Sequence, residues 1–298
     1  MGAAVNLGPV IVLVALFVPA LIAGSLMALL VSRRPQFDPA SAHAASVAAH
    51  AIERELEDDR GPAPWARRHF DPKTSTGLAL LAALIVIIVG GLVVGALALL
   101  VRAHIGQGID NAVAPWGTEH GTAFTHDVVK AVTQLGGTTG LMIVVVVVLI
   151  MEMRRRPTRW LPVFVLVVAI GQPFVTNTIK DLLERVRPTI DPGAAALGPS
   201  FPSGHSAGAA ACFAALALVL GRGRSPRAHA LLAGAAVFIA VAVATSRVLL
   251  GVHWLTDVIG GLALGWTWFA VCAVAFGGRV LRFGAPIEAA ERTVDAHS

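Results

Sequence analysis

The stretch GLALLAALIVIIVGGLVVGALALLV, residues 77–101, decides the fold class of this chain. It carries no charge, and it exceeds the roughly 20 helical residues that cross a hydrocarbon core about 30 Å thick. Lipid offers no hydrogen-bond partner to open backbone groups, so an apolar run of this length is stable there as a helix. The stretch therefore predicts a membrane-spanning α-helix, and strands should be few or absent.

Composition extends this prediction to the whole chain. Of its 298 residues 56% are hydrophobic and 14% are charged, with a mean hydropathy of +0.74. A soluble domain carries about 25% charged residues, so this class of protein is excluded. Six further apolar runs have similar character: 9–31, 128–151, 160–178, 205–220, 230–249 and 255–276. We expect an all-α, polytopic transmembrane helix bundle with seven crossings.

The runs and the polar stretches between them divide the chain into four parts. We expect an N-terminal transmembrane helix at 1–32, a polar cytoplasmic linker at 33–75, a six-helix core at 76–278 and a cytoplasmic tail at 279–298. The first run lacks the basic leader of a signal peptide, so we predict a retained helix. The linker is predicted to hold one surface helix near residues 41–57.

Arginine placement predicts orientation, because short cytoplasmic loops of membrane proteins are rich in Lys and Arg. With seven helices, five arginine groups fall on one side, at 33–34, 67–68, 154–156, 222–227 and 279–282. The C-terminus is then cytoplasmic and the N-terminus lies outside. We expect an integral protein of a bacterial plasma membrane.

The outward segments are 102–127, 179–204 and 250–254, and the second of them breaks the rule. Lys180, Arg185 and Arg187 place three cations on the side that should be poor in them. This exception calls for a local reason. Nucleic-acid binding is not that reason, because no basic stretch is interleaved with aromatics that could stack on bases.

Lys180 and Arg187 form the first of three polar clusters on this outward side. They are seven residues apart, two turns of a helix, so we expect them to share one helix face. A guanidinium suits bidentate contact with a phosphate, and an ammonium supplies a point charge. The alternative is that both side chains reach toward lipid headgroups.

Ser203, Gly204 and His205 form the second cluster, directly before an apolar run. Ser203 is a plausible N-cap, and the free N–H groups of a helix start, approached closely at Gly204, favour anions. His205 would then lie in the first turn, where it could deliver a proton to a leaving oxygen. The alternative is an ordinary capped helix start with an interfacial histidine.

The third cluster comprises Ser246, Arg247, His253 and Asp257. On a helix, residues four apart are neighbours, so the Asp257 carboxylate can accept a hydrogen bond from the His253 imidazole. This contact would fix the tautomer and leave the other nitrogen free to attack. The alternative is a structural ion pair, although ionisable residues at membrane helices are usually functional.

Together the three clusters resemble the signature of the type 2 phosphatidic acid phosphatase and vanadium haloperoxidase superfamily. Eleven identities agree in order and spacing, which makes accidental agreement much less probable than for a single short motif. Residues 132–136 are similar to a weaker family feature, and residues 1–75 lie outside the resemblance. The matching runs are Lys180 with Arg187-Pro188, Pro202-Ser203-Gly204-His205, and Ser246-Arg247 with His253 and Asp257.

The resemblance implies a role for each of these residues. Lys180, Arg187 and Arg247 would hold the phosphate, with Ser203 and the Gly204 amide completing the cradle. His253 would attack phosphorus, Asp257 would orient His253, and His205 would protonate the leaving group. A phosphohistidine intermediate would then be hydrolysed by water, and no metal or other cofactor is required. The implied substrate is a lipid phosphate taken from the surrounding membrane lipids, with no nucleic-acid partner.

Two further groups of residues lie outside the three clusters. The outward loop holds His104, His120, His126, Asp110, Glu119 and Asp127. Their spacing matches no metal site, so we interpret them as solvated loop residues. A second group, Gln172, Pro173 and Asn177, interrupts one apolar run and indicates either a pocket wall or a helix kink.

Several functions share such a site. The favoured one is hydrolysis of a membrane-borne phosphate ester or diphosphate, such as phosphatidic acid, phosphatidylglycerol phosphate or polyprenyl diphosphate. A lipid phosphotransferase would use an acceptor hydroxyl in place of water. A vanadate-dependent haloperoxidase is disfavoured by the many crossings, and a non-catalytic lipid-binding bundle would not need the acid and the nucleophile. Nothing in the sequence indicates the oligomeric state.

Overall fold

A computed structural model describes residues 7–33, 75–188, 190 and 198–276, with the side chains of 75–82 excepted. These residues form helices and no strand, which confirms the predicted all-α class. The predicted surface helix at 41–57, the rest of the linker and the C-terminal tail lie outside the described residues.

Six of the helices are long and apolar enough to cross a membrane. They are α1 (Gly8–Arg33), α4 (Ser75–Arg102), α9 (Trp160–Leu183), α10 (Gly204–Gly221), α11 (Pro226–Leu249) and α12 (Leu255–Phe276). A seventh crossing requires that α7 (Ala123–Gln134) and α8 (Thr138–Arg155) be counted together, since they are bent by 51° at a short break. The predicted number of seven crossings is reached if this bent pair forms one crossing.

The break in the seventh crossing was not predicted, because residues 128–151 form one apolar run. It falls at Gly136 and Gly137, after α7 ends at Gln134. A Cβ on Gly136 would collide with the His205 carbonyl and the Val243 side chain. Glycine both weakens a helix and permits close approach of another backbone. The bend therefore brings the α7–α8 junction against the start of α10.

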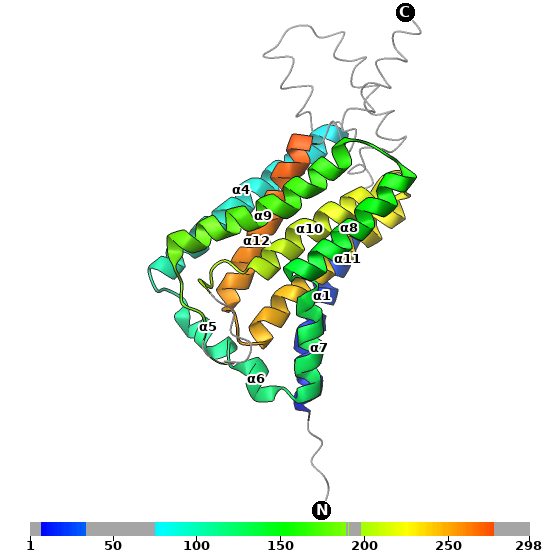
Figure 1. Cartoon of the computed structure of the whole chain (residues 1–298). Coiled ribbons are helices and arrows are strands. Elements are labelled where there is room, and N and C mark those ends of the chain that lie inside the picture. Colours follow the sequence, from blue (N-terminus) through cyan, green and yellow to red (C-terminus); the bar gives the residue numbers. More distant parts are fainter. Residues whose placement is uncertain (1–6, 34–74, 189, 191–197, 277–298) are drawn as a thin grey trace, which may run out of the picture.

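The helix α10 lies at the centre of the bundle and packs against α8, α9, α11 and α12 (Figure 1). Its residues 207–211 are Ala-Gly-Ala-Ala-Ala, and all five are buried. Opposite them, Gly265 of α12 leaves no room for a Cβ beside the Ala207 carbonyl. Small residues let membrane helices approach closely, so this interface holds α10 and α12 in one register.

The helix α1 packs along α11, with a buried stripe at Val12, Leu16, Ala20 and Gly24. Its first residues lie at the same end of the bundle as the short helices α5 (Gln107–Val113) and α6 (Trp116–His120), whereas α12 ends at the opposite end (Figure 1). The arginines that end α1 and α8 also lie at that opposite end. These arginines therefore gather at one end of the bundle, and the side of the membrane that this end faces stays a prediction.

Candidate active site

The three sequence clusters meet at the end of the bundle that carries α5 and α6, where α9 and α11 end and α10 and α12 begin (Figure 1). Four other residues of these clusters lie close enough to His205 to interact with it electrostatically: Lys180, Arg187, Arg247 and His253. Helices that alternate in direction bring these separate stretches of sequence to one place. The clusters therefore form one site.

Lys180 and Arg187 do not share a helix face, and this part of the prediction is wrong. Helix α9 stops before Glu184, which adopts a left-handed conformation with φ 47°, and Arg187 follows in non-helical chain. A left-handed residue ends an α-helix. The two cations converge instead on the Pro199 carbonyl, which accepts from Lys180 Nζ at 3.0 Å and from Arg187 Nη2 at 3.2 Å.

The start of α10 is capped as predicted. The Ser203 hydroxyl accepts a hydrogen bond from the Ser206 N–H at 3.4 Å, and His205 lies in the first helical turn. The Ser203 N–H in turn donates to the Asp257 carbonyl at 3.0 Å. This bond ties the start of α10 to the first turn of α12. Gly204 and His205, the first two residues of α10, line a cavity at this position.

His253 and Asp257 are in contact as predicted, although His253 lies in the turn before α12 and not on a helix. The distance between His253 Nδ1 and Asp257 Oδ2 is 3.3 Å. Arg187 Nη1 lies 3.0 Å from His253 Nε2. A guanidinium can only donate, so Nε2 must present its lone pair and Nδ1 must carry the proton. This is the tautomer that leaves Nε2 nucleophilic.

Burial keeps this imidazole neutral. His253 is 2% exposed and Asp257 is 0% exposed. Loss of solvation lowers the pKa of His253 to about 4, because it outweighs the opposite effect of the Asp257 carboxylate. Burial also lowers the pKa of Arg187. The neutral form of His253 is therefore the stable form at physiological pH.

Arg247 supplies a third cation from α11. Its side chain is 7% exposed, and Nη1 donates to the Thr133 hydroxyl of α7 at 3.1 Å. Its Nε is buried and has no hydrogen-bond partner among the described residues. A buried donor without a partner costs about 1–3 kcal/mol, and donors on charged groups cost more. Such a donor is suited to an anion that enters the site.

A cavity of about 250 Å³ opens from the site into the bundle. Lys180, Gly204 and His205 lie at its polar end, and Gly208 and Cys212 of α10 line it farther along. Its side walls come from α8 and α9. The residues that interrupt the apolar run of α9 all line this cavity: Gln172, Pro173 and Asn177. The helix α9 continues through Pro173.

Three residues at the site were missed from the sequence: Asp110, Arg185 and Thr256. Asp110 was interpreted as a solvated loop residue, and this is wrong because it is 2% exposed. It binds Arg185 at 2.7 Å and Thr256 at 2.6 Å. Arg185 was seen only as part of the charge exception. Their partners are remote in sequence, so no local spacing could have identified them.

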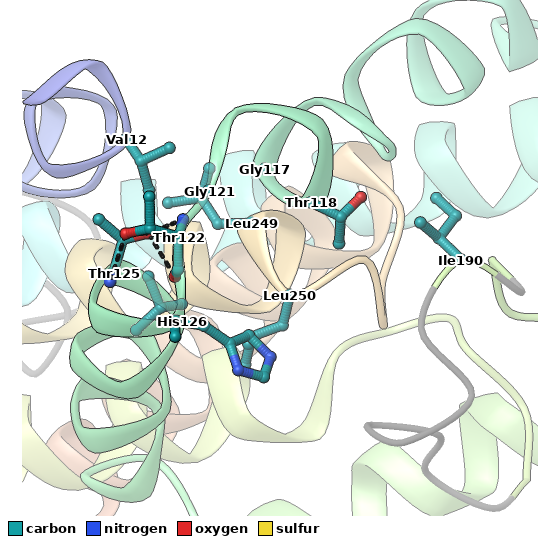
Figure 2. A pocket seen from close by; sticks show the side chains of 12 residues that line it. Val12, Gly117, Thr118, Gly121, Thr122, Thr125, His126, Ile190, Leu249 and Leu250 are labelled. Carbon is teal, nitrogen blue, oxygen red and sulfur yellow. Dashed lines mark hydrogen bonds between the residues drawn. The ribbon is translucent and has the colours of Figure 1, made fainter. Parts of the chain in front are cut away.

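Another cavity, of about 400 Å³, lies beside α1 and contains none of the residues predicted for the site. Figure 2 shows Thr122, Thr125 and His126 around it, with Leu249 and Leu250 nearby. Thr122 caps α7 and accepts from the Thr125 N–H. His104 and His120 are exposed, as expected of loop residues. Within the described residues, no group of three His, Cys, Asp or Glu side chains could hold a metal ion.

Comparison with known proteins identifies relatives of this chain. The profile of the PAP2 superfamily matches residues 159–280. The chain is 31% identical to phosphatidylglycerophosphatase B of Bacillus subtilis (strain 168) over 175 residues, which cover 57% of this chain and 84% of that protein. It is 33% identical to lipid A 1-phosphatase of Rhizobium johnstonii over 124 residues, which cover 38% of this chain and 46% of that protein.

A solved structure supports the same relationship. The fold is similar to the crystal structure of the first transmembrane PAP2 type phosphatidylglycerolphosphate phosphatase from Bacillus subtilis, with a TM-score of 0.56 and 29% sequence identity. The match covers 62% of this chain and 95% of that one. These relatives are phosphoric monoester hydrolases, so the alternative of a non-catalytic lipid-binding bundle is set aside. The chain belongs to the PAP2 superfamily and is an integral membrane lipid phosphatase of that type.

Proposed function

We propose that this protein hydrolyses a lipid phosphate or diphosphate monoester through a phosphohistidine formed on His253. The observation that carries the proposal is the Arg247 Nε, a buried cationic donor without a partner among the described residues, in the same site as the lone pair of His253 Nε2. A phosphoryl group would accept from the one and react with the other. Transfer of a phosphoryl group needs mainly positioning and charge stabilisation, which fixed cations can supply.

The phosphate cradle consists of Lys180, Arg187 and Arg247 with the Ser203 hydroxyl and the Gly204 amide. Lys180 and Arg187 are held in place by the Pro199 carbonyl. In the proposed complex, Arg187 transfers its Nη1 hydrogen bond from His253 Nε2 to a phosphate oxygen. This exchange frees the nucleophile at the moment when the phosphate is bound. Three cations thereby stand where magnesium ions act in other phosphoryl transfer enzymes.

The chemical steps then balance at named atoms. The bound phosphate dianion would hold His205 in its imidazolium form. His253 Nε2 donates its lone pair to phosphorus, the bond from phosphorus to the lipid oxygen breaks, and the His205 imidazolium transfers its proton to that oxygen. Asp257 stabilises the imidazolium through Nδ1. A water molecule then attacks phosphorus, His205 accepts its proton, and the P–N bond breaks to release inorganic phosphate.

The cavity between α8 and α9 supports a lipid as the substrate. Its polar end holds Lys180 and His205, and its far end is apolar at Cys212. A headgroup could bind at the site while a chain stays in the hydrocarbon. Phosphatidylglycerol phosphate, phosphatidic acid and polyprenyl diphosphate belong to this class, and the B. subtilis relative's name favours the first. We place the site on the extracytoplasmic face of a bacterial plasma membrane, because the arginine-rich helix ends lie opposite.

The test is phosphate release by the purified protein from these three lipids in mixed micelles, with and without vanadate. We expect inorganic phosphate from at least one of them and inhibition by vanadate, which resembles the phosphoryl transition state. Excess EDTA should leave the rate unchanged, since the cradle is built from side-chain cations. A new phospholipid in place of inorganic phosphate would indicate a phosphotransferase. Turnover that EDTA abolishes would contradict the metal-independent mechanism.

The pKa of His253 predicts the acid limit of activity. Since this pKa is about 4, the nucleophile stays neutral as pH falls from 7 to 5, and attack is lost only as pH falls through about 4. The free enzyme's limb appears in the pH profile of kcat/KM. The substrate phosphate itself titrates near pH 6, so two substrates of different phosphate pKa must be compared. A limb near pH 6.5 that both substrates share would contradict the prediction.

A further inference from the structure

Arg185 lies between two buried carboxylates that come from different helices. Its Nη1 donates to Asp257 Oδ1 at 2.6 Å, and its Nη2 donates to Asp110 Oδ2 at 2.7 Å. The side chains of the two acids are 0% and 3% exposed, and that of Arg185 is 12% exposed. The guanidinium also lies 5.5 Å from the centre of the Trp254 ring. Both of its terminal nitrogens are therefore occupied by the protein.

Asp110 belongs to α5, and it also binds the start of α12. Its Oδ1 accepts from the Thr256 N–H at 3.0 Å, and its Oδ2 accepts from the Thr256 hydroxyl at 2.6 Å. The first N–H groups of a helix lack partners within the helix. Asp110 therefore supplies from another helix the cap that α12 needs, and it fixes where Arg185 can sit.

The bond from Arg185 decides which oxygen of Asp257 faces the nucleophile. Because Arg185 occupies Oδ1, Oδ2 is left to accept from His253 Nδ1 at 3.3 Å and from the Trp254 N–H at 2.9 Å. The carboxylate is thus held on both sides. Rotation of Asp257 away from His253 would break the short bond to Arg185.

Arg185 is also the ionic partner of both acids. Its ion pairs with Asp257 and Asp110 are 2.6 and 2.7 Å long, whereas Lys180 and Arg187 bind the Pro199 carbonyl. Removing one partner of a buried ion pair is strongly destabilising, because the other charge stays buried without compensation. Loss of Arg185 would therefore leave two carboxylates that repel each other, and it would loosen the Asp257 side chain.

We propose that Arg185, fixed by Asp110, is a positioning residue that holds the Asp257 carboxylate oriented toward His253, and that it does not bind the substrate phosphate. This role rests on the proposed function of His253 as the nucleophile. It adds to the reaction a pair of residues that lie outside the three motifs. It also gives α5, in the connection between α4 and α7, a part in the chemistry.

The test compares steady-state kinetics of the purified full-length protein and its variants on the lipid that the wild type hydrolyses best. We expect Arg185→Gln to lower kcat by about 10- to 100-fold, the range of coupling between residues in contact. KM should change by less than about threefold, because phosphate binding is untouched. The acid limb should move up by about one pH unit, because an Asp257 carboxylate no longer shared with Arg185 favours the charged form of His253 more strongly.

Asp110→Asn in the Arg185→Gln background supplies a sharper outcome. It removes the carboxylate that would repel Asp257, so the double variant should regain part of the lost kcat and return the acid limb toward the wild-type position. Arg102→Gln and Asp127→Asn are matched controls. Both residues are exposed, and they lie at the end of α4 and near the start of α7, the helices that α5 and α6 connect. Both controls should keep the wild-type kcat and pH profile.

Arg185→Lys guards against a variant that does not fold. It keeps the charge but cannot reach both carboxylates with a planar fork, so we expect a smaller fall in kcat with the limb shifted in the same direction. Thermal unfolding in detergent reports the folded fraction of each variant. A KM that rises while kcat holds would overturn the proposal and make Arg185 a phosphate ligand. A rate that falls equally at every pH would overturn it as well, since that result reports only lost folded protein.

The wild type separates failure of this inference from failure of the proposed function. If the wild type releases no phosphate from any lipid of the panel, the proposed function fails and the role of Arg185 fails with it. If the wild type is active and Arg185→Gln leaves kcat and the acid limb unchanged, only the positioning role is overturned.

Discussion

Replacing His253 by alanine should abolish phosphate release, with a fall in kcat of about 10⁴-fold or more. This is the largest effect that we expect from any single substitution. Removal of a nucleophile leaves only the catalysis that binding and charge provide, and losses in other covalent enzymes are of that order. Binding should persist, because Lys180, Arg187 and Arg247 remain. The measurement is phosphate release from the best lipid of the panel together with binding of vanadate.

A matched control for His253→Ala is His120→Ala. His120 is a histidine of the same predicted face, but it is exposed on α6 and is not in the site. We expect wild-type activity from that variant. A rapid quench with substrate labelled at phosphorus should trap labelled protein in the wild type and none in His253→Ala. Retained turnover in His253→Ala, or label trapped on another residue, would contradict the phosphohistidine mechanism.

Replacing His205 by alanine should produce the second-largest loss, and its size should depend on the leaving group. For a lipid alkoxide, which needs a proton as it departs, we expect kcat to fall by about 10²- to 10⁴-fold, the usual contribution of a general acid. For p-nitrophenyl phosphate, whose leaving group is stable as an anion, the fall in phosphoenzyme formation should be at least tenfold smaller. The rate of phosphoenzyme formation on each substrate is the measurement.

The substrate comparison for His205→Ala distinguishes an acid from a phosphate ligand. His205 lies in the first turn of α10, at the polar end of the cavity between α8 and α9. If it only contacted the phosphate, both substrates would lose rate equally, and an equal loss would therefore contradict the assigned role. His104→Ala is the control, because His104 is exposed and its Nδ1 contacts the neighbouring Gln107 side chain. It should leave both rates unchanged.

Much of the fold could be predicted from the sequence, because each membrane crossing depends on the composition of one local run of residues. The length and composition of a run such as residues 77–101 are enough to place it in lipid as a helix, and distant residues are not needed for this. The break between α7 and α8 could not be predicted in this way. This break depends on the close approach of Gly136 to the carbonyl of His205, which lies 69 residues later in the sequence. The linker and tail predictions remain predictions.

Part of the candidate site could also be predicted from the sequence. The cap at Ser203 and the contact between His253 and Asp257 were predicted, because each joins residues at most four apart. The same local reasoning failed for Lys180 and Arg187. It extended α9 as a helix, whereas the left-handed Glu184 ends it. The roles of these residues in phosphate binding and catalysis await the experiments above.

The sequence by itself determined the class of fold and the residue types of the three motifs, since these follow from hydropathy and short-range spacing. Only the tertiary structure decided which partner each cation contacts. Arg185 meets Asp110 and Asp257 across separations of 75 and 72 residues. Arg187, two positions later, reaches His253 Nε2. Contacts of this range depend on how helices pack, and no local pattern encodes that packing.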